Sequence, residues 1–182
     1  MSTDWVFGYG SLTADARDGH AAVLRGYRRR WGVAMDNSRD LPGYKWYRQR
    51  ATGERPAVFV AFLDLVADRD GSAVNGLCLP VDAPLLERLD ARERNYERVD
   101  VTTAIEAPRG RVWTYVGSRA ARARLARGLR ERRAVVSQEY VDDVEHGFRR
   151  LGDGQLDAYR ACTEPLPPGC ETLSLERIDL PG

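Results

Sequence analysis

The sequence predicts an α+β domain: a small mixed β-barrel with flanking helices and a C-terminal pair of helices. The order of the segments supports this class, because strand-like patterns with one helix among them precede residue 117 and helical patterns follow it. The chain has 182 residues, of which 43% are hydrophobic, so it can bury one core of ordinary size. We find no repeat or linker, and residues 1–182 are therefore expected to form a single domain.

Apolar runs and alternating patterns predict the strands in the first half of the chain. Residues 4–8 are expected to form a short buried strand that ends in glycine, and residues 21–35 an extended or bent strand with one solvated face. Two further strands, 57–66 and 74–81, are separated by the turn-forming residues 68–72. We expect these two strands to pair as a hairpin.

The other connections are predicted from breakers and turn residues. Residues 38–56 are polar or aromatic and contain proline and glycine, so they are expected to form a long loop near the functional site. A second hairpin is expected with a turn at 108–110. The strands expected in this part of the chain and beyond it are 96–107, 112–116 and a short final strand near 173–178.

Helices are predicted where apolar residues recur at helical spacing behind a capping residue. Asp82 is the expected cap of the first helix, which has Pro84 in its first turn and a stripe of three leucines. Ser137 and Asp153 are the expected caps of two later helices. The predicted helical segments are 82–93, 118–133, 137–151 and 153–161.

Charge and hydropathy argue against nucleic-acid and membrane partners. The formal net charge is +1 at pH 7, which gives no strong field to attract polyanions. Residues 119–133 contain seven arginines and one acid, a pattern more typical of a solvated helix face than of a nucleic-acid site. No apolar run approaches the roughly 20 residues of a membrane span, and residues 1–4 lack signal-peptide features. We expect a cytoplasmic protein, as a monomer or homodimer.

Cysteine and histidine usage argues against disulfides and metal. Cys78, Cys162 and Cys170 are odd in number and widely spaced, which favours buried thiols in a reducing compartment. The histidines are His20 and His146, and neither Cys-x-x-Cys nor His-x-x-x-His spacing occurs. A metal site is therefore not expected.

The first candidate site is the segment Gly8-Tyr9-Gly10-Ser11-Leu12, which follows the first predicted strand. Glycines at this place let backbone N–H groups point together at a small anionic group. A dinucleotide fingerprint would need a third glycine at position 13, which is Thr13, and no Gly-Lys-Ser/Thr phosphate loop is present. The segment is therefore either a loop for a small anion or an ordinary structural turn.

The second candidate site spans residues 89–96, where the first long helix ends and a strand begins. Asp90 and Glu93 lie three positions apart and would share a helix face. Arginines lie on both sides of these carboxylates, so a set of surface ion pairs of small energy is the alternative interpretation. Alone, neither candidate segment identifies an activity.

Taken together, the two segments resemble the γ-glutamylcyclotransferase-like family. Residues 6–12 are similar to the substrate loop of that family, and residues 89–93 with Tyr96 are similar to the stretch that bears its catalytic glutamate. The resemblance covers most of the chain and extends, more weakly, to residues 36–38, to Tyr115 and to the closing helices. The first residues look more like the glutathione-degrading branch, whereas the closing helices look nearer to the general cyclotransferases.

The resemblance implies that 5-oxoproline is released from a small γ-glutamyl substrate. Its α-amine would attack the γ-carbonyl, with Glu93 as the acid/base in a partly desolvated pocket that raises its pKa. No metal or organic cofactor is required. The loop amides that would bind the α-carboxylate or the growing oxyanion belong to Tyr9, Gly10, Ser11 and Leu12. The further side chains expected to line the pocket are Asn37, Tyr96 and Tyr115.

Several alternatives stay open from the sequence. A non-catalytic relative with the same fold would bind a small acidic metabolite. A nucleic-acid-binding or protein-interaction domain would use the arginines of residues 119–133. The leaving group of a γ-glutamyl substrate is an amino acid, a peptide, a polyamine or a natural product. Residues 41–56 have no recognised counterpart in the family, and folded over the pocket they would shape the leaving-group side.

Overall fold

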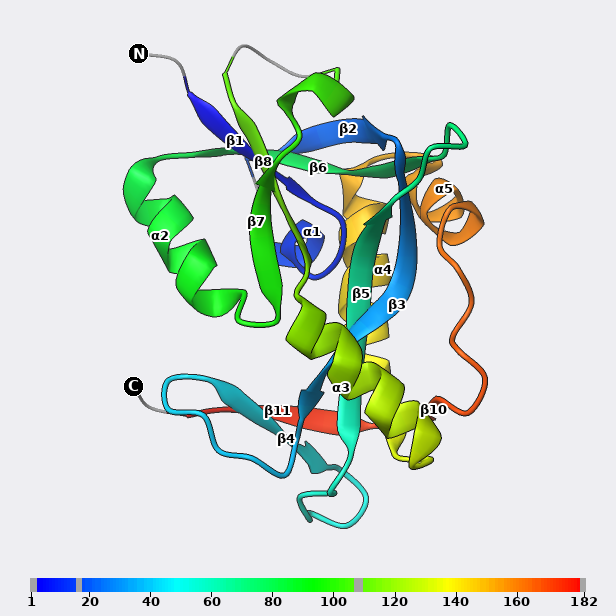
Figure 1. The fold of residues 1–182 in the computed structure, drawn as a ribbon. Coiled ribbons are helices and arrows are strands. Elements are labelled where there is room, and N and C mark those ends of the chain that lie inside the picture. Colours follow the sequence, from blue (N-terminus) through cyan, green and yellow to red (C-terminus); the bar gives the residue numbers. More distant parts are fainter. Residues whose placement is uncertain (1–2, 16–17, 107–109, 181–182) are drawn as a thin grey trace.

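The computed structural model describes residues 3–15, 18–106 and 110–180 and confirms the α+β class. Its strands form a five-stranded, a four-stranded and a two-stranded sheet, and no closed barrel is detected among the described residues. Figure 1 shows the five-stranded sheet at one end of the molecule and the two-stranded sheet at the other. The four-stranded sheet connects these two ends through its long strands.

The five-stranded sheet has β1 (Asp4–Gly8) at its centre, as expected for the buried strand that begins the chain. Strand β1 pairs antiparallel with β6 (Ala73–Val81) and parallel with β8 (Val112–Gly117). The outer strands are β2 (His20–Arg25) and β7 (Tyr96–Asp100). Strands β7 and β8 form the predicted antiparallel hairpin, whose expected turn at 108–110 lies mostly outside the described residues.

The four-stranded sheet contains β10 (Glu171–Leu173), β9 (Ala134–Ser137), β5 (Phe59–Ala67) and β3 (Tyr27–Asp36), in that order. The predicted hairpin between β5 and β6 is wrong, because β5 pairs with β3 and β9 whereas β6 pairs with β1 and β2. Seven consecutive residues of β5 are buried, so this strand is covered on both faces and serves as the centre of its own sheet.

Two predicted segments are divided differently in the structure. The expected bent strand over 21–35 is split at Gly26, where a φ of 75° accompanies the turn of the chain from β2 into β3. The expected long loop over 38–56 contains strand β4 (Lys45–Gln49), which pairs antiparallel with β11 (Leu175–Asp179). The loop prediction is therefore wrong for these five residues. Their strand partner lies at the far end of the sequence, where local patterns cannot reveal it.

The helices begin largely where their caps predict. Asp82 accepts a hydrogen bond from the N–H of Leu85 at 2.8 Å, and Ser137 accepts one from the N–H of Tyr140 at 3.4 Å. The predicted cap Asp153 is wrong, because the last helix is capped by Gly154 in a left-handed conformation without a side-chain bond. The helices are α1 (Leu12–Asp15), α2 (Ala83–Arg92), α3 (Arg119–Arg130), α4 (Gln138–Leu151), α5 (Gln155–Ala161) and the 3-10 turn η1 (Thr102–Ala104).

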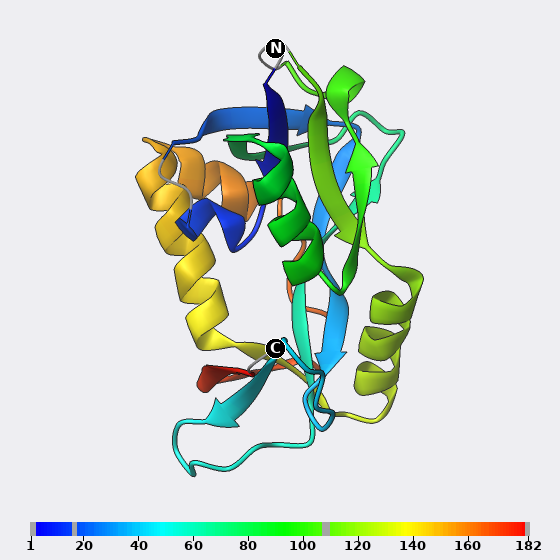
Figure 2. The same cartoon turned by 90° about the vertical axis from the view of Figure 1, so that its left-hand side faces the viewer.

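The C-terminal pair of helices is held to the sheets by a buried arginine. Arg29 of β3 is fully buried, and its guanidinium lies 5.0 Å from the ring of Phe148 in α4 and 4.9 Å from the ring of Tyr159 in α5. In Figure 2 helix α4 lies to the left of the central strands and helix α2 lies in front of them. This arrangement brings the start of α4 and the end of α2 to the same region as the loop after β1.

Helix α3 carries five of the seven arginines of residues 119–133, and several of these side chains bind other parts of the molecule. Arg122 pairs with the buried Asp64 at 2.9 Å, and Arg124 donates hydrogen bonds to the carbonyl of Ala34 and the side chain of Asn95. The cysteines are free thiols. Within the described part of the chain, no helix is both long and apolar enough to cross a bilayer.

Candidate active site

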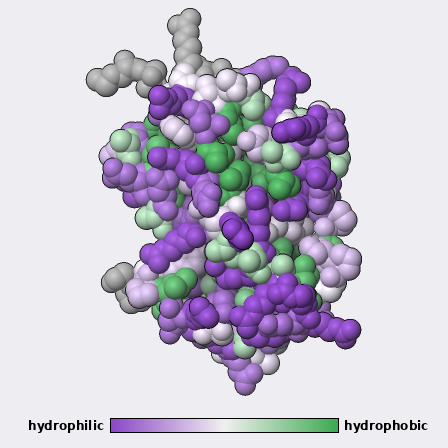
Figure 3. All heavy atoms as spheres, viewed as in Figure 1, coloured by the Kyte–Doolittle hydropathy of each residue, from purple (hydrophilic) through white to green (hydrophobic). Residues whose placement is uncertain are grey.

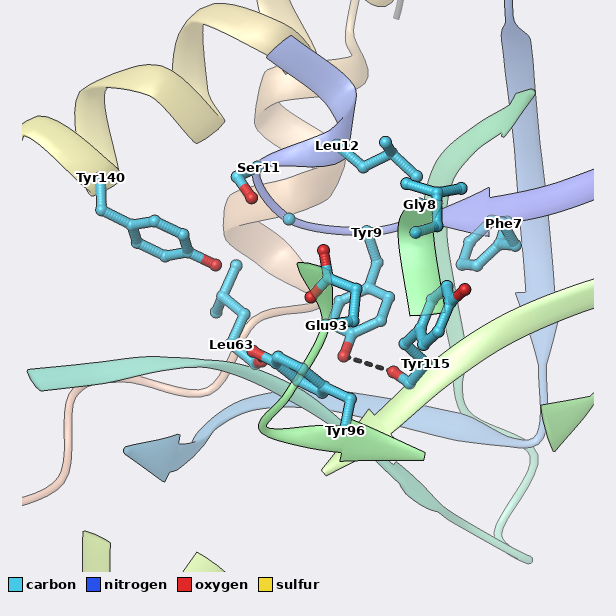
Figure 4. Close-up of a pocket in the computed structure, with 12 residues that line it drawn as sticks. Phe7, Gly8, Tyr9, Ser11, Leu12, Leu63, Glu93, Tyr96, Tyr115 and Tyr140 are labelled. Carbon is cyan, nitrogen blue, oxygen red and sulfur yellow. Dashed lines mark hydrogen bonds between the residues drawn. The ribbon is translucent and has the colours of Figure 1, made fainter. Parts of the chain in front are cut away.

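A cavity of about 40 Å³ brings the two candidate segments together. The predicted site residues that line it are Tyr9, Gly10, Ser11, Leu12, Glu93, Tyr96 and Tyr115. Phe7, Gly8 and Leu89 also line it and lie within the candidate segments, whereas Leu63 and Tyr140 lie outside both segments. Figure 4 shows the Glu93 carboxylate and the Tyr140 hydroxyl directed toward the space beside the loop that carries Ser11.

The loop between β1 and α1 is compact because its glycines lie against other side chains. A Cβ atom on Gly10 would lie 3.0 Å from the Tyr140 hydroxyl, and one on Gly8 would lie 2.9 Å from the Cβ of Leu12. The carbonyl of Gly10 accepts hydrogen bonds from the N–H of Thr13 at 3.0 Å and from its hydroxyl at 2.7 Å. Position 13 thus closes the turn, in the place where a dinucleotide fingerprint would have glycine.

Glu93 is held at the end of α2 by backbone hydrogen bonds. Its N–H donates to the carbonyl of Leu89, and its carbonyl accepts from the N–H of Tyr96, both at 2.9 Å. Its side chain is 22% exposed, and the Nε atom of Arg92 lies 3.4 Å from its Oε1 atom. The carboxylate is therefore both positioned by the helix end and accessible from the cavity (Figure 4).

Asp90 has a different environment from Glu93 although the two share a helix. Its Oδ1 atom accepts a hydrogen bond from the Tyr115 hydroxyl at 2.8 Å, and its Oδ2 atom lies 2.9 Å from the guanidinium of Arg98. Asp90 does not line the cavity. The ion-pair interpretation therefore describes Asp90, whereas Glu93 is the carboxylate that faces the cavity.

Two tyrosines of the cavity have their hydroxyl groups bound to backbone carbonyls. The hydroxyl of Tyr9 donates to the carbonyl of Tyr115 at 2.7 Å, as Figure 4 shows, and the hydroxyl of Tyr96 donates to the carbonyl of Leu63 at 2.7 Å. Burial raises the pKa of both Tyr9 and Tyr96 well above the ordinary value, and nearby acids add to this effect. Both phenols stay neutral and serve as walls of the cavity, not as bases.

Asn37 lies outside the cavity that it was expected to line. Its side chain is fully buried, donates to the carbonyls of Tyr47 and Pro56 at 2.9 Å each, and accepts from the N–H of Tyr47 at 2.7 Å. These bonds fasten the segment around β4 to the end of β3. Asn37 thus supports a neighbouring element of the site and contacts the cavity only through it.

A second cavity of about 30 Å³ adjoins the first. The two cavities share Ser11, Glu93, Tyr96 and Tyr140, and the second adds Tyr44, Lys45, Phe62, Arg92 and Asn95. Burial, together with the nearby Arg177, lowers the pKa of Lys45 to about 8, whereas Glu93 acts in the opposite direction. The start of β4 therefore lies at the candidate site, where Lys45 contributes a positive charge.

Sequence reasoning missed Tyr140 and Lys45 for different reasons. Tyr140 belongs to the apolar stripe of its helix, so its pattern indicates packing, and only the fold shows that its hydroxyl end reaches the cavity. Lys45 had a usable signal, because it is the single lysine of the chain and stands among aromatic residues. Its distance from residues 8–12 and 89–93 in the sequence concealed its place beside them.

Comparison with solved structures supports the fold. The crystal structure of YkqA from Bacillus subtilis matches with a TM-score of 0.60 and 17% identity, over 91% of this chain and 55% of that one, so the present chain spans about half of YkqA. A yeast γ-glutamyl cyclotransferase specific to glutathione matches with a TM-score of 0.56 and 15% identity, over 90% of this chain and 98% of that one. A structure described as a gamma-glutamyl cyclotransferase gives a TM-score of 0.53 and 12% identity, over 90% and 89%.

The family follows from the sequence match. No curated protein matches significantly. The model of the family described as "Gamma-glutamyl cyclotransferase, AIG2-like" matches residues 6–141, a range that contains both the β1–α1 loop and Glu93. That range covers well over half of the chain, and the solved structures share its fold. The chain therefore belongs to the AIG2-like gamma-glutamyl cyclotransferase family.

Proposed function

We propose that this protein is a cofactor-independent γ-glutamylcyclotransferase that releases 5-oxoproline from a γ-glutamyl amide. The observation that carries the proposal is the position of Glu93, whose carboxylate lines a cavity together with the β1–α1 loop. Membership of the family adds support. A single accessible carboxylate beside a compact glycine loop is the minimum that an intramolecular acyl transfer needs, because the substrate supplies its own nucleophile.

The reaction balances without an external reactant. The α-nitrogen of the substrate forms a bond to the γ-carbon, and the bond from that carbon to the departing nitrogen breaks. Glu93 accepts a proton from the attacking amine and returns it to the departing amine, so that it ends in its starting state. The products are 5-oxoproline and a free amine. Neither an electron transfer nor a phosphoryl group is involved, and the bond changes call for no organic cofactor or metal.

The β1–α1 loop would hold the part of the substrate that becomes the ring. Its backbone amides, from Tyr9 to Leu12, are candidates for binding the α-carboxylate or the oxyanion that develops on the γ-carbonyl. Tyr9, Tyr96 and Tyr115 have their hydroxyls bound to protein oxygens, so they contribute shape and exclude water. A partly dry cavity strengthens the interaction of Glu93 with the amine proton.

The proposal is tested by measuring 5-oxoproline release from glutathione, γ-glutamyl amino acids and γ-glutamyl amines. We expect Glu93→Gln to keep the melting temperature and to lower kcat by at least about 100-fold, the usual contribution of a general acid/base. Asp90→Asn is the matched control, since it neutralises a carboxylate on the same helix that lies outside the cavity. We expect this variant to keep most of the activity.

Two outcomes would contradict the proposal. Full activity in a folded Glu93→Gln protein would remove the acid/base role of that residue. Binding of γ-glutamyl compounds without release of 5-oxoproline by the wild type would instead indicate a non-catalytic relative that binds a small acidic metabolite.

A further inference from the structure

Lys45 places a positive charge in the cavity next to Glu93. Its ammonium nitrogen lies 4.6 Å from the ring centre of Phe62, 5.5 Å from that of Tyr44 and 5.9 Å from that of Tyr47. It lines the second cavity together with Glu93 and Arg92. Two cations and one carboxylate thus face this space, which therefore favours an anion.

The position of Lys45 is fixed by bonds on both sides. In β4 it lies opposite Asp179 of β11, and the preceding residue, Tyr44, accepts a hydrogen bond at its hydroxyl from the side chain of Asn95 at 3.1 Å. Arg94 donates to the carbonyl of Pro42 at 2.9 Å. Because Asn95 and Arg94 directly follow Glu93, these contacts hold the start of β4 in register with the proposed acid/base.

Across residues 3–15, 18–106 and 110–180, Lys45 forms no ion pair within 4.0 Å. Its cross-strand neighbour Asp179 is bound by the guanidinium of Arg177 at 2.7 Å. Burial and the nearby Arg177 lower the pKa of Lys45 to about 8, so the ammonium form still predominates at neutral pH, and Glu93 and Asp179 favour it without a direct ion pair. A bound carboxylate would supply the direct ion pair that the described residues do not.

The second cavity lies on the leaving-group side of the proposed reaction. A base that takes a proton from the attacking amine and returns it to the departing amine must reach both nitrogens. Glu93 lines both cavities, and the β1–α1 loop glycines line the first alone. The cavities hold about 40 and 30 Å³, only a few water-sized volumes each, so a γ-glutamyl amide would span both. With its glutamyl part at the loop, its leaving part lies toward Lys45.

We propose that Lys45 is a specificity-determining residue that binds a carboxylate on the leaving group, so that the preferred substrates are γ-glutamyl amino acids or peptides and not γ-glutamyl polyamines. This inference rests on the proposed cyclotransferase function and deepens it. A cationic leaving group would meet Lys45 and Arg92 and be repelled, and a neutral amide would leave the ammonium without a counter-charge.

The test compares three substrates whose leaving groups carry a negative, no and a positive charge: γ-glutamylalanine, γ-glutamylalaninamide and γ-glutamylputrescine. The first two differ only in the carboxylate, which the second replaces with an amide. We expect kcat/KM of the wild type to fall at least about tenfold from the first to the second and further to the third. In Lys45→Met, kcat/KM for γ-glutamylalanine should fall at least about tenfold, whereas the value for the amide should change little. Lys45→Arg should retain part of the preference. The control Arg48→Met removes a cation of the same strand that binds Glu176, outside both cavities, and should keep the wild-type preference.

Binding of the same compounds is measured by calorimetry in parallel, so that the two proposals can fail separately. A carboxylate preference in binding that Lys45→Met abolishes, without any 5-oxoproline release, would overturn the catalytic function and support the subsite. Turnover with equal losses for γ-glutamylalanine and its amide in Lys45→Met would overturn the subsite, because Lys45 would then serve the shared glutamyl part. Absence of both binding and turnover would overturn both.

Discussion

Glu93 and Asp90 are carboxylates three positions apart on one helix, and their surroundings separate their roles. Tyr115 and Arg98 bind Asp90, which is thereby occupied as a structural acceptor. Glu93 stands at the end of the helix, where the chain turns toward β7 and the side chain meets the cavity. A helix end places a charged group at a cavity wall without burying it in the core.

Gly10 gives the first prediction at the residue scale. Gly10→Ala would add a Cβ atom 3.0 Å from the Tyr140 hydroxyl, tighter than ordinary contacts, so the loop or the ring must shift. We expect kcat/KM for the best γ-glutamyl substrate to fall roughly tenfold, since small displacements of positioning groups are costly. Steady-state kinetics with a melting control would measure this effect.

Tyr140→Phe provides the matched control for the Gly10 variant. It removes the hydroxyl that the new Cβ would meet, so Gly10→Ala combined with Tyr140→Phe should regain activity relative to Gly10→Ala alone. If the two losses simply add, the contact between these residues is not the cause, and the compact loop has another origin.

Lys45 gives a pH-dependent prediction. Its pKa is about 8 in the folded protein and near 10.4 in an unfolded chain, so between these values the unfolded state binds more protons and stability rises with pH. We expect the unfolding free energy of the wild type, relative to Lys45→Met, to increase from pH 7.5 to pH 9.5 in urea titrations. The charged and titratable groups around Lys45 are common to both proteins: Arg92, Arg177, Glu93, Asp179, Tyr44 and Tyr47. A flat or opposite difference would contradict the burial of this ammonium.

Most residues of the candidate site could be predicted from the sequence. The residues that could not be predicted are those brought to the site from distant segments of the chain. The loop at Gly8 to Leu12 and the helix end at Glu93 are local patterns, and the cavity confirms that they face each other. The pattern around Asn37 placed that residue beside the substrate, but its side chain bonds Tyr47 and Pro56 instead. An asparagine that bonds the protein backbone and one that binds a ligand look the same in a sequence. Only the structure shows which partner the side chain has.

At the scale of elements, β5 decides the topology that the sequence left ambiguous. Its apolar run predicts a strand and the residues after it predict a turn, and both are found, but the turn does not join a hairpin. Neighbouring strands in sequence usually pair, yet β5 is buried on both faces and pairs instead with β3 and β9. The pattern of apolar residues in a strand indicates how much of the strand is buried. It does not indicate which strands pair with it.

Asp64 of β5 gives the prediction at this scale. The carboxylate is fully buried, accepts from the N–H of Gly117 at 2.7 Å and pairs with Arg122 of α3 at 2.9 Å. Asp64→Ala leaves these donors without an acceptor, and we expect it to lower the free energy of unfolding by roughly 3 kcal/mol. Urea denaturation measures the loss.

The control for Asp64 is an exposed ion pair of helix α3, the helix that carries Arg122. Arg127 binds Glu131 at 2.6 Å with half of its side chain in solvent, so Arg127→Ala should leave the unfolding free energy nearly unchanged. Similar destabilisation by Asp64→Ala and Arg127→Ala would show that burial does not explain the contribution of the Asp64 pair to the free energy of unfolding.

For the affinity of the whole molecule for polyanions, the contacts that the arginines make matter more than the number of arginines. Figure 3 shows hydrophilic residues covering the face over α3, and several arginines there are engaged with Asp64, Asn95 and Glu131. With a formal net charge of +1, the protein has no excess field for a polyanion.

The corresponding prediction concerns nucleic acids. We expect fluorescence anisotropy to detect no binding of single- or double-stranded oligonucleotides tighter than about 10⁻⁴ M at physiological salt. Tighter, salt-dependent binding that weakens in Arg119→Ala, Arg130→Ala or Arg132→Ala proteins would revive an interaction role for this face. These three arginines belong to the cluster at residues 119–133 and leave the Asp64 and Asn95 contacts intact.

The pairing of β4 with β11 also determines when the site can be completed during synthesis of the chain. Arg48 and Glu176, which are paired in this ladder, stand 128 positions apart. A ribosome that has finished the β1–α1 loop, Glu93 and Tyr140 has still to make the strand against which Lys45 is held. A nascent chain therefore contains both Lys45 and Glu93 before it contains β11, so the proposed selectivity requires a strand that is made after both residues.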